Sequence, residues 1–376
     1  SELEAKDDES SNAVDKIKKK GKDHGITYTD RDKYYAVLLM DGDKMGDLIN
    51  GTTIDARWQD VLHPELEKRF QNQEFSPASP LRPVLNDKRS LNPSLHVAIS
   101  DSLNSFARFG VAPVIREAGG RLIYAGGDDV CAIVPLNTAL DAAAKIYKAY
   151  SLGFVRYTAK GAESLSGTIS EYEDKIGMHL GQASGISISG GLVIAHHKQP
   201  LREVLRDAHG LLDGVAKDKA GRNALAIRLK KRSGSDRDVW FNWDERNLFC
   251  SQNELLSESF QHVMDGVASE DVASRLVYRL GDLEGAVAPL ATSVKQLEDN
   301  RDKINRLFAY EVRHSGKISS QNGEEREKVV KTLAARLAGM CIRYPSTETD
   351  WFNPESAIIA RFLAPKDTRR KHGHMV

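Results

Sequence analysis

The stretch that most constrains the fold is Leu122–Pro135, LIYAGGDDVCAIVP, in which two apolar runs flank Gly126, Gly127, Asp128 and Asp129. Glycine accepts the positive φ that a tight turn needs and aspartate tolerates turn positions, so the pattern predicts two antiparallel strands joined by a short turn. The turn itself has two open interpretations. It is either an ordinary polar hairpin tip or a place where two carboxylates meet a metal ion and a triphosphate.

Strand and helix patterns alternate on both sides of this hairpin. Apolar residues are concentrated in the segments assigned to strands and recur at helical spacing in the segments between them. In order, we expect a strand at 34–43, a helix at 94–120, hairpin strands within 121–136, a helix at 137–150, a strand at 183–197, a helix at 199–221 and a strand at 222–232. This order contains the βαββαβ arrangement, so the sequence predicts a ferredoxin-like α+β domain.

The rest of the chain divides by composition. Residues 1–30 are charged and poor in apolar periodicity, which indicates a flexible lead-in or linker. The α+β domain then spans 31–235, with a polar, proline-containing insertion at about 51–95. From 236 to 376 the periodicity is helical with few strand signals, so we expect an all-α C-terminal domain. The chain starts at Ser1 in a polar stretch, which suggests a piece of a longer protein.

The balance of charge limits how this chain could hold a nucleic acid. It has 53 basic and 53 acidic residues and a formal net charge of zero, whereas proteins that bind nucleic acid by charge alone are usually basic. Any such role must depend on local basic patches or on a partner. Cys131, Cys250 and Cys341 form no CxxC pair, so they predict neither a zinc site nor disulfides and fit a reducing cytoplasm. No apolar run approaches the roughly 20 residues of a membrane span.

Acidic residues follow the first predicted strand, as Asp41-Gly42-Asp43, and occupy the hairpin turn, as Asp128-Asp129. In a βαββ core the first strand lies beside the hairpin strands, so its end and the hairpin turn meet at one edge of the sheet. Carboxylates gathered there repel one another unless a cation compensates them. Mg²⁺ prefers such ligands, and two ions could bind the attacking and leaving oxygens of a phosphoryl transfer. Aspartate and glycine are also ordinary turn residues, so a purely structural role stays open.

Basic residues lie at the end of the last predicted helix, where Lys217, Lys219 and Arg222 precede the final strand. Lysine can bind a triphosphate as a mobile point charge. The same residues could instead stabilise the helix dipole, and Gly221 could simply end the helix. Both interpretations remain open for the two lysines.

Three segments together resemble the polymerase/cyclase palm domain of the large subunit of type III CRISPR effector complexes. They are LLMDGDKMGDLING, LIYAGGDDVCAIVP and GISISGGLVIAHHKQPLREVLRDAHGLLDGVAKDKAGRNALAI. The GLVIAHHKQPL stretch is most similar to the III-B, or Cmr-type, subunit. The same palm is related to GGDEF diguanylate cyclases and, more distantly, to class III nucleotidyl cyclases. The resemblance covers residues 31–232 in order and, more loosely, the helical region that follows.

The resemblance implies an enzyme that makes cyclic oligoadenylates from ATP through 3′–5′ phosphodiester bonds when a guide-loaded complex binds target RNA. It implies two Mg²⁺ or Mn²⁺ ions as cofactors and no membrane. The implied partners are ATP, the other protein subunits of the effector complex, and the crRNA and target RNA held by that complex.

The resemblance also assigns roles to residues. Catalysis and metal binding fall on Asp41, Asp128 and Asp129, with the carbonyl of Gly42 as a further metal ligand. Nucleotide contacts fall on Gly42, Gly126, Gly127, Ser187, Lys217 and Lys219. Ser184 and Ser189 lie on the same predicted strand as Ser187 and could also face adenine, although strand serines are often just small packing residues.

The chain departs from the full pattern of that subunit, which usually also carries an N-terminal HD nuclease domain, another palm-like domain and a zinc-binding insertion. No HD motif precedes the palm and no zinc cysteines are present, so we expect the C-terminal half of such a subunit. His196-His197 is not expected to bind metal because adjacent residues on a strand point to opposite faces. Two other functions remain as alternatives: a GGDEF-like dinucleotide cyclase, and a non-catalytic scaffold subunit of the RNA-guided complex.

Overall fold

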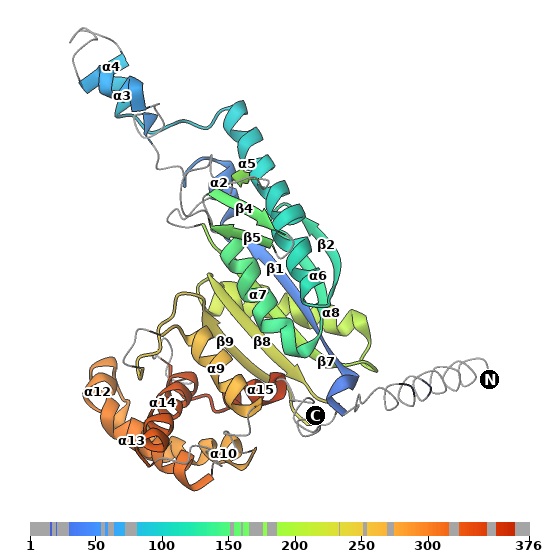
Figure 1. The fold of residues 1–376 in the computed structure, drawn as a ribbon, viewed down its shortest axis with the longest axis vertical. Helices are drawn as coiled ribbons and strands as arrows, with labels where there is room; N and C mark the ends of the chain where they lie inside the picture. Colours follow the sequence, from blue (N-terminus) through green and yellow to red (C-terminus); the bar gives the residue numbers. More distant parts are fainter. Residues whose placement is uncertain are drawn as a thin grey trace, which may run out of the picture.

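The fold is built around a six-stranded sheet that helices cover on both faces (Figure 1). The structure is a computed structural model, and apart from Lys16 and Lys20 it describes residues 30–53, 57–58, 64–71, 81–150, 154–158, 161–164, 176–178, 186–232, 234–250, 254–268, 274–315, 323–343 and 351–364. Most of the predicted lead-in at 1–30 and the candidate Ser184 lie outside the described residues. The short η1 (Asp30–Lys33) leads directly into the first strand.

The sheet has the strand order β2-β3-β1-β7-β8-β9. Its strands are β1 (Tyr34–Gly42), β2 (Arg121–Gly126), β3 (Asp129–Val134), β7 (Ile188–His196), β8 (Ala224–Lys230) and β9 (Arg237–Asn242). Neighbouring strands are antiparallel except β7 and β8, which are parallel and joined by a helical crossover. The part β2-β3-β1-β7 has the order of a βαββαβ unit, so the predicted ferredoxin-like α+β fold is confirmed.

β1 lies inside the sheet and is buried on both faces because its sequence is apolar almost throughout. Ala36, Leu38 and Met40 belong to one hydrophobic core, and Val37 and Leu39 belong to the other. Side chains alternate between faces along a strand, so the residues at the carboxyl end of β1 are divided between the two faces in the same way.

One face of the sheet is covered by α7 (Leu136–Tyr150) and by the long helix predicted before the hairpin. The long helix consists of α5 (Pro93–Ser105), the π-helical segment η3 (Phe106–Val111) and α6 (Ala112–Glu117). Pro113 has no N–H to donate, and the wider π-helical segment just before it accommodates this loss without ending the helix. Gly119, with a φ of 73°, ends the helix as predicted.

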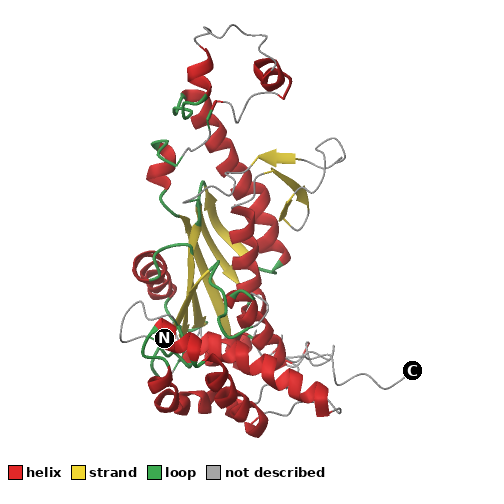
Figure 2. Ribbon diagram, turned by 90° about the vertical axis from the view of Figure 1, so that its left-hand side faces the viewer, coloured by secondary structure: helices red, strands yellow, loops and turns green. Residues whose placement is uncertain are grey.

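The opposite face is covered by α8 (Leu201–Gly210) and its π-helical continuation η5 (Leu211–Lys219), so helices flank the sheet on both sides (Figure 2). Apolar residues of this helix form a core with β1, β7 and β8. Gly191 of β7 lets the helix approach closely, because a Cβ there would lie 3.0 Å from the backbone nitrogen of Leu212. The helix that carries Lys217 is thereby held against the strands beside Asp41.

The chain also forms elements where the sequence patterns predicted none. A small antiparallel sheet has the order β5-β4-β6, with β4 (Phe154–Thr158), β5 (Gly161–Ser164) and β6 (Ile176–Met178). The short α2 (Met45–Ile49) follows β1. The region predicted as an insertion contains α3 (Pro64–Gln71), α4 (Leu81–Leu85) and the start of α5.

β9 begins after the boundary predicted at residue 235 and adds one more strand to the sheet. The elements described after it are helical: α9 (Leu256–Ala268), α10 (Ser274–Arg279), η6 (Leu280–Leu283), α11 (Glu284–Val287), η7 (Ala288–Leu290), α12 (Val294–Asp299), α13 (Arg301–Ser315), α14 (Gly323–Cys341) and α15 (Glu355–Leu363). Within the described part of the chain, none of the helices combines the length and apolar character needed to cross a membrane.

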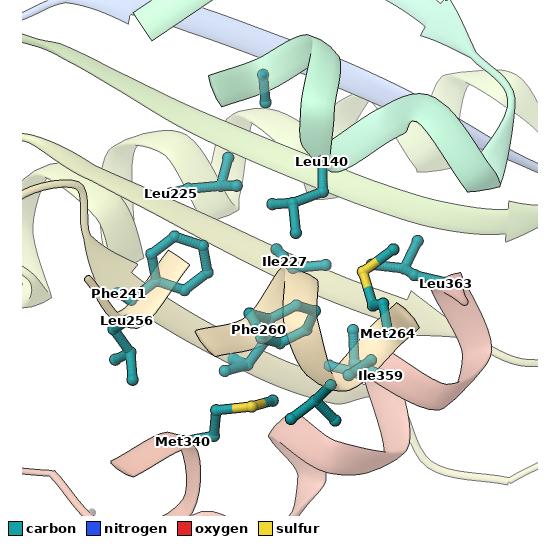
Figure 3. Close-up of a cluster of buried hydrophobic side chains, with 14 of the residues drawn as sticks. Leu140, Leu225, Ile227, Phe241, Leu256, Phe260, Met264, Met340, Ile359 and Leu363 are labelled. Atoms are coloured by element: carbon teal, nitrogen blue, oxygen red, sulfur yellow. The ribbon is translucent and has the colours of Figure 1, made fainter. Parts of the chain in front are cut away.

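The helical region shares a hydrophobic core with the sheet (Figure 3). Ile227 of β8 and Phe241 of β9 lie in one cluster with Phe260 of α9 and Ile359 of α15. Arg237 of β9 also forms an ion pair with Glu355 of α15, at 2.9 Å. The helices and the sheet are therefore held together by both apolar packing and charge.

Candidate active site

Asp41 and Asp129 lie side by side where β1 ends and β3 begins. β1 and β3 pair Met40 with Val130, so the next residues in this register, Asp41 and Asp129, are opposite each other and share a face of the sheet. A hydrogen bond with Asp41, burial, and repulsion from Asp41 and Asp128 raise the pKa of Asp129 to about 6. The fold thus brings together carboxylates that stand 88 positions apart in the sequence (129 − 41).

Lys217 of η5 reaches this pair from the helix that covers the same face. Its ammonium group donates a hydrogen bond to Asp41 Oδ2 and lies 3.6 Å from Asp213 Oδ1, one turn earlier on the helix. Burial disfavours the charged ammonium, but the hydrogen bond and charge of Asp41 outweigh it and raise the pKa of Lys217. The Lys217 side chain is 16% exposed, so it stays charged at the boundary between the protein and solvent.

Asp128 lies against Gly42, on the other side of the end of β1. A Cβ at position 42 would come within 2.8 Å of Asp128 Cβ and would also meet the hydroxyl of Tyr150. Only glycine therefore leaves space for Asp128 at this place. Burial and repulsion from Asp41 raise the pKa of Asp128. The hairpin turn itself depends on Gly127, whose φ is 66°.

Asp43 has a different environment from the other three aspartates. It is 4% exposed and accepts hydrogen bonds from Ser187 Oγ at 2.6 Å, Ser189 Oγ at 2.8 Å and the backbone N–H of Asn223 at 2.9 Å. Arg222 Nη1 is 3.9 Å from its Oδ1. Asp43 therefore ties the end of β1 to β7 and to the loop that leads from η5 into β8.

That loop has an unusual backbone. Gly221, Arg222 and Asn223 have positive φ values of 79°, 75° and 49° in succession, a conformation that L-residues other than glycine rarely adopt. Asn242 of β9 also holds it, because its Nδ2 donates to the carbonyl oxygens of Ala220, at 3.0 Å, and Arg222, at 2.8 Å. The bonds from Asp43 and Asn242 stabilise a strained turn directly after the helix that carries Lys217.

This role of Asp43 was not predicted from the sequence, although the sequence contains a signal for it. Residues two apart on a strand share a face, so Asp43 must lie on the same face as Asp41. Ser187 and Ser189 show the same spacing on the strand that pairs with β1, where Asp41 lies opposite Ser189. The paired D-x-D and S-x-S patterns were sufficient to predict a carboxylate bonded to serine hydroxyls.

The donor set fits a hard divalent cation that also binds substrate. Asp41 and Asp129 are adjacent and offer oxygen ligands only, and the crowding of carboxylates raises the pKa of Asp129. Among the residues that the structure describes, no group of three or more His, Cys, Asp or Glu side chains is placed to hold a metal ion by itself. An open set of one or two carboxylates is what Mg²⁺ usually takes, because it keeps water and phosphate oxygens as its other ligands.

The remaining predicted site residues are distributed around this edge. Gly126 is the last residue of β2 and pairs with Asp129. Lys219 is exposed at the end of η5. Ser187 donates its hydroxyl to Asp43, so its predicted contact with a nucleotide stays a prediction.

The structure corrects the reasoning on His196-His197. β7 ends at His196, so His197 no longer follows the alternation of a strand, and the two rings lie 4.4 Å apart instead of on opposite faces. His196 is buried against Tyr34, with ring centroids 5.1 Å apart, and its Nδ1 accepts a hydrogen bond from the backbone N–H of Lys198. His197 is exposed.

Comparison with known families gives a match to the second palm domain of Cas10/Cmr2 over residues 34–226, about half of the chain. CRISPR system Cmr subunit Cmr2 of Pyrococcus furiosus is 34% identical over 229 residues, which are 60% of this chain and 22% of that protein. CRISPR system CMR subunit Cmr2 of Saccharolobus solfataricus is 28% identical over 155 residues, which are 41% of this chain and 14% of that protein. The matched part therefore spans less than a quarter of the length of these relatives.

Two solved structures share the fold over 92% of this chain. One is the apo state of a type III-B Cmr-beta complex, with a TM-score of 0.56, 15% identity and 39% of the matched chain covered. The other is type III-B Cmr-beta bound to cognate target RNA, with a TM-score of 0.56, 16% identity and 40% covered. At this identity the likeness concerns the fold.

Proposed function

The chain belongs to the Cas10/Cmr2 family, whose second palm domain it carries, and on that premise we propose that it is a nucleotidyltransferase that makes cyclic oligoadenylates from ATP. In this reaction the 3′-oxygen of one ATP forms a bond to the α-phosphorus of another, the bond to the β-phosphate breaks, and pyrophosphate leaves. The observation that carries the proposal is the meeting of Asp41, Asp129 and Lys217 at one edge of the sheet. An ordinary hairpin tip needs no lysine from a distant helix.

Asp41, Asp128 and Asp129, with the carbonyl of Gly42, are the groups that would hold Mg²⁺ or Mn²⁺. Two such ions would neutralise the attacking and leaving oxygens when bound. The side chains themselves supply fixed negative charge at an edge where β1 and the hairpin hold it rigidly, so little reorganisation is needed when substrate arrives.

Lys217 is the group best placed to meet a triphosphate. It is charged, partly buried, and paired with Asp41. A bound metal ion would neutralise this carboxylate in place of Lys217 and so free the ammonium group for a phosphate. Its flexible stem allows the ammonium to turn from Asp41 toward a phosphate without moving the helix. Gly127 has open space where a side chain would begin, so a nucleotide could approach the backbone of the turn closely.

The proposal includes assembly into a type III-B effector complex. The curated relatives are named as subunits of Cmr systems, and one structure with this fold is a complex bound to cognate target RNA. We infer that this chain contacts other protein subunits, and crRNA and target RNA through them, and that target RNA activates the site.

The test is ATP turnover by the assembled complex with its guide and target RNA. ATP or GTP is supplied with Mg²⁺ or Mn²⁺, and the products are resolved by mass spectrometry. We expect cyclic oligoadenylates from ATP, and their loss in the double variant Asp128→Ala, Asp129→Ala. The matched control, Asp101→Ala with Asp141→Ala, removes two exposed carboxylates from α5 and α7 and should leave turnover unchanged.

The outcome also separates the alternatives. A cyclic dinucleotide made from GTP would support a GGDEF-like cyclase instead. Unchanged ATP turnover in the double variant would show that this site is not catalytic and would leave the scaffold function.

A further inference from the structure

A group of basic residues lies at the end of the sheet opposite the acidic site. β1 runs from Tyr34 at this end to Gly42 at the acidic end, and β7 runs back to His196 (Figure 1). The backbone N–H of His197 donates to the carbonyl of Lys33 at 2.8 Å, which continues the β1–β7 pairing by one residue. The N–H of Lys198 donates to His196 Nδ1 at 3.2 Å, so the backbones of Lys33, His197 and Lys198 are held in fixed positions.

Arg232, just after β8, completes the group, which we define as the basic cluster of Lys33, His197, Lys198 and Arg232. All four side chains are exposed and surround the buried His196. Burial and the charges of these four residues together hold the pKa of His196 below its ordinary value. The cluster therefore acts as a local positive field on a chain whose net charge is zero.

Two other cations near the same end of the sheet are neutralised within the fold. Arg228 pairs with Asp238 at 2.7 Å, and Lys230 pairs with Asp207 at 2.5 Å. In the part of the chain that the structure describes, Lys198 and Arg232 have no carboxylate within 4.0 Å. Asp32 is the acidic neighbour of Lys33 in the sequence and is also exposed. Two members of the cluster, Lys198 and Arg232, thus carry positive charge that no carboxylate of the described residues neutralises.

We propose that the basic cluster is a binding surface for the phosphate backbone of RNA. Lysine binds phosphate as a point charge and needs no apolar surroundings. Protein interfaces, by contrast, are depleted in lysine and enriched in aromatic residues, and the cluster contains two lysines and no phenylalanine, tyrosine or tryptophan. The inference rests on the proposed assembly with RNA and goes beyond it, because it assigns a direct contact with RNA to this chain.

The expected affinity of the basic cluster for RNA follows from the number of its cations. Each phosphate neutralised on a single strand contributes about 0.7 to the slope of log affinity against log salt. The three lysine and arginine cations of the cluster, on a net-neutral chain, predict weak binding that salt abolishes, with a dissociation constant of about 10⁻⁶ to 10⁻⁴ M. The cluster alone is therefore expected to position RNA in an assembled complex rather than to capture it from solution.

The test uses the full chain and a fluorescein-labelled single-stranded RNA, with binding followed by fluorescence anisotropy over about 50 to 200 mM salt. The test variant is Lys33→Glu, Lys198→Glu, Arg232→Glu. The control variant is Arg326→Glu, Lys328→Glu, Lys331→Glu, which changes the same residue types to the same extent on the exposed side of α14. Thermal melting of both variants verifies that they fold.

We expect the test variant to lose about tenfold or more in RNA affinity at low salt and to show a salt slope shallower by about 2. The control should bind like the native chain. Equal losses in both variants would overturn the proposal, because binding would then follow net charge alone. Competition by polyglutamate as effective as competition by unlabelled RNA, at equal charge, would also overturn it in favour of an acidic protein partner.

The same variants keep this inference distinct from the proposed function. An effector complex that contains the test variant should retain the basal ATP chemistry of the acidic site, which lies at the other end of the sheet. Failure of the native complex to contain RNA would defeat the proposed assembly. If the native complex contains RNA but the test variant binds RNA as tightly as the native chain does, only the assignment of the basic cluster is wrong.

Discussion

Replacing Asp43 with alanine should destabilise the protein far more than removing an exposed carboxylate does. Asp43 accepts hydrogen bonds from Ser187, Ser189 and the N–H of Asn223, and it is 4% exposed. In Asp43→Ala the hydroxyl of Ser189, which is fully buried, loses its carboxylate partner. An orphaned buried donor costs about 1–3 kcal/mol, and breaking a buried charged network costs about 3–5 kcal/mol. We therefore expect the free energy of unfolding to fall by about 3–5 kcal/mol.

The assay is denaturant unfolding of the native chain and of four variants: Asp43→Ala, Ser189→Ala, the double variant and the control Asp101→Ala. The control is an exposed residue of α5 and should change stability by less than about 0.5 kcal/mol. Asp43→Ala leaves the hydroxyl of Ser189 without its carboxylate acceptor, and Ser189→Ala removes that hydroxyl. The two losses of stability should therefore not be additive, with a coupling energy of about 1–2 kcal/mol. A loss below about 1 kcal/mol for Asp43→Ala, or additive effects of the two substitutions, would show that Asp43 and Ser189 do not form a stabilising buried network.

Three further predictions concern the acidic edge. Gly42→Ala should abolish ATP turnover by displacing Asp128, as measured by product formation in the assembled complex, whereas Gly214→Ala, on the solvent side of η5 with open space around its Cα, should leave it intact. Lys217→Met should raise the KM for ATP about tenfold or more, because it removes the ammonium group proposed to contact the triphosphate. Lys217→Arg keeps a positive charge and should raise the KM less, whereas an unchanged KM in Lys217→Met would argue against the contact. In metal-free buffer the free energy of unfolding should fall as the pH rises from about 4 through 6, because Asp129 holds its proton more tightly in the folded state than in the unfolded state. Asp129→Asn should flatten this dependence in denaturant unfolding at a series of pH values, and an identical slope in both proteins would contradict the assignment.

Much of the fold was predictable because the hairpin and the apolar strand before it restrict the order of strands. Leu122–Pro135 can hardly form anything but a hairpin, and the strand at 34–43 is too apolar to lie at an edge. Both features follow from local residue patterns. Strand β9 was not predicted because RDVWFN is short and polar at both ends, and the contacts that stabilise it, with β8 and with the helical region, are long-range. The small sheet of β4, β5 and β6 was not predicted either, because its strands are only five, four and three residues long.

The site was predictable to the extent that strand pairing determines it. The meeting of Asp41 and Asp129 follows from the β1–β3 register, which the hairpin argument anticipated. The position of Lys217 depends on a π-helical segment and on a loop with three successive positive φ values, and a helical period of 3.6 residues contains no sign of either. The bonds of Asp43 depend on the long-range pairing of β1 with β7. The predicted βαββαβ order places these strands side by side, and the matching D-x-D and S-x-S spacings indicate the bonded face.

The proposed metal and nucleotide site can be tested directly by an experimental structure of the chain with Mn²⁺ and a non-hydrolysable ATP analogue. We expect anomalous scattering from manganese at the oxygens of Asp41 and of Asp128 or Asp129, with Lys217 turned from Asp41 to the triphosphate. Nucleotide bound elsewhere, or Lys217 still paired with Asp41 beside a metal-free carboxylate pair at saturating ligand, would contradict it.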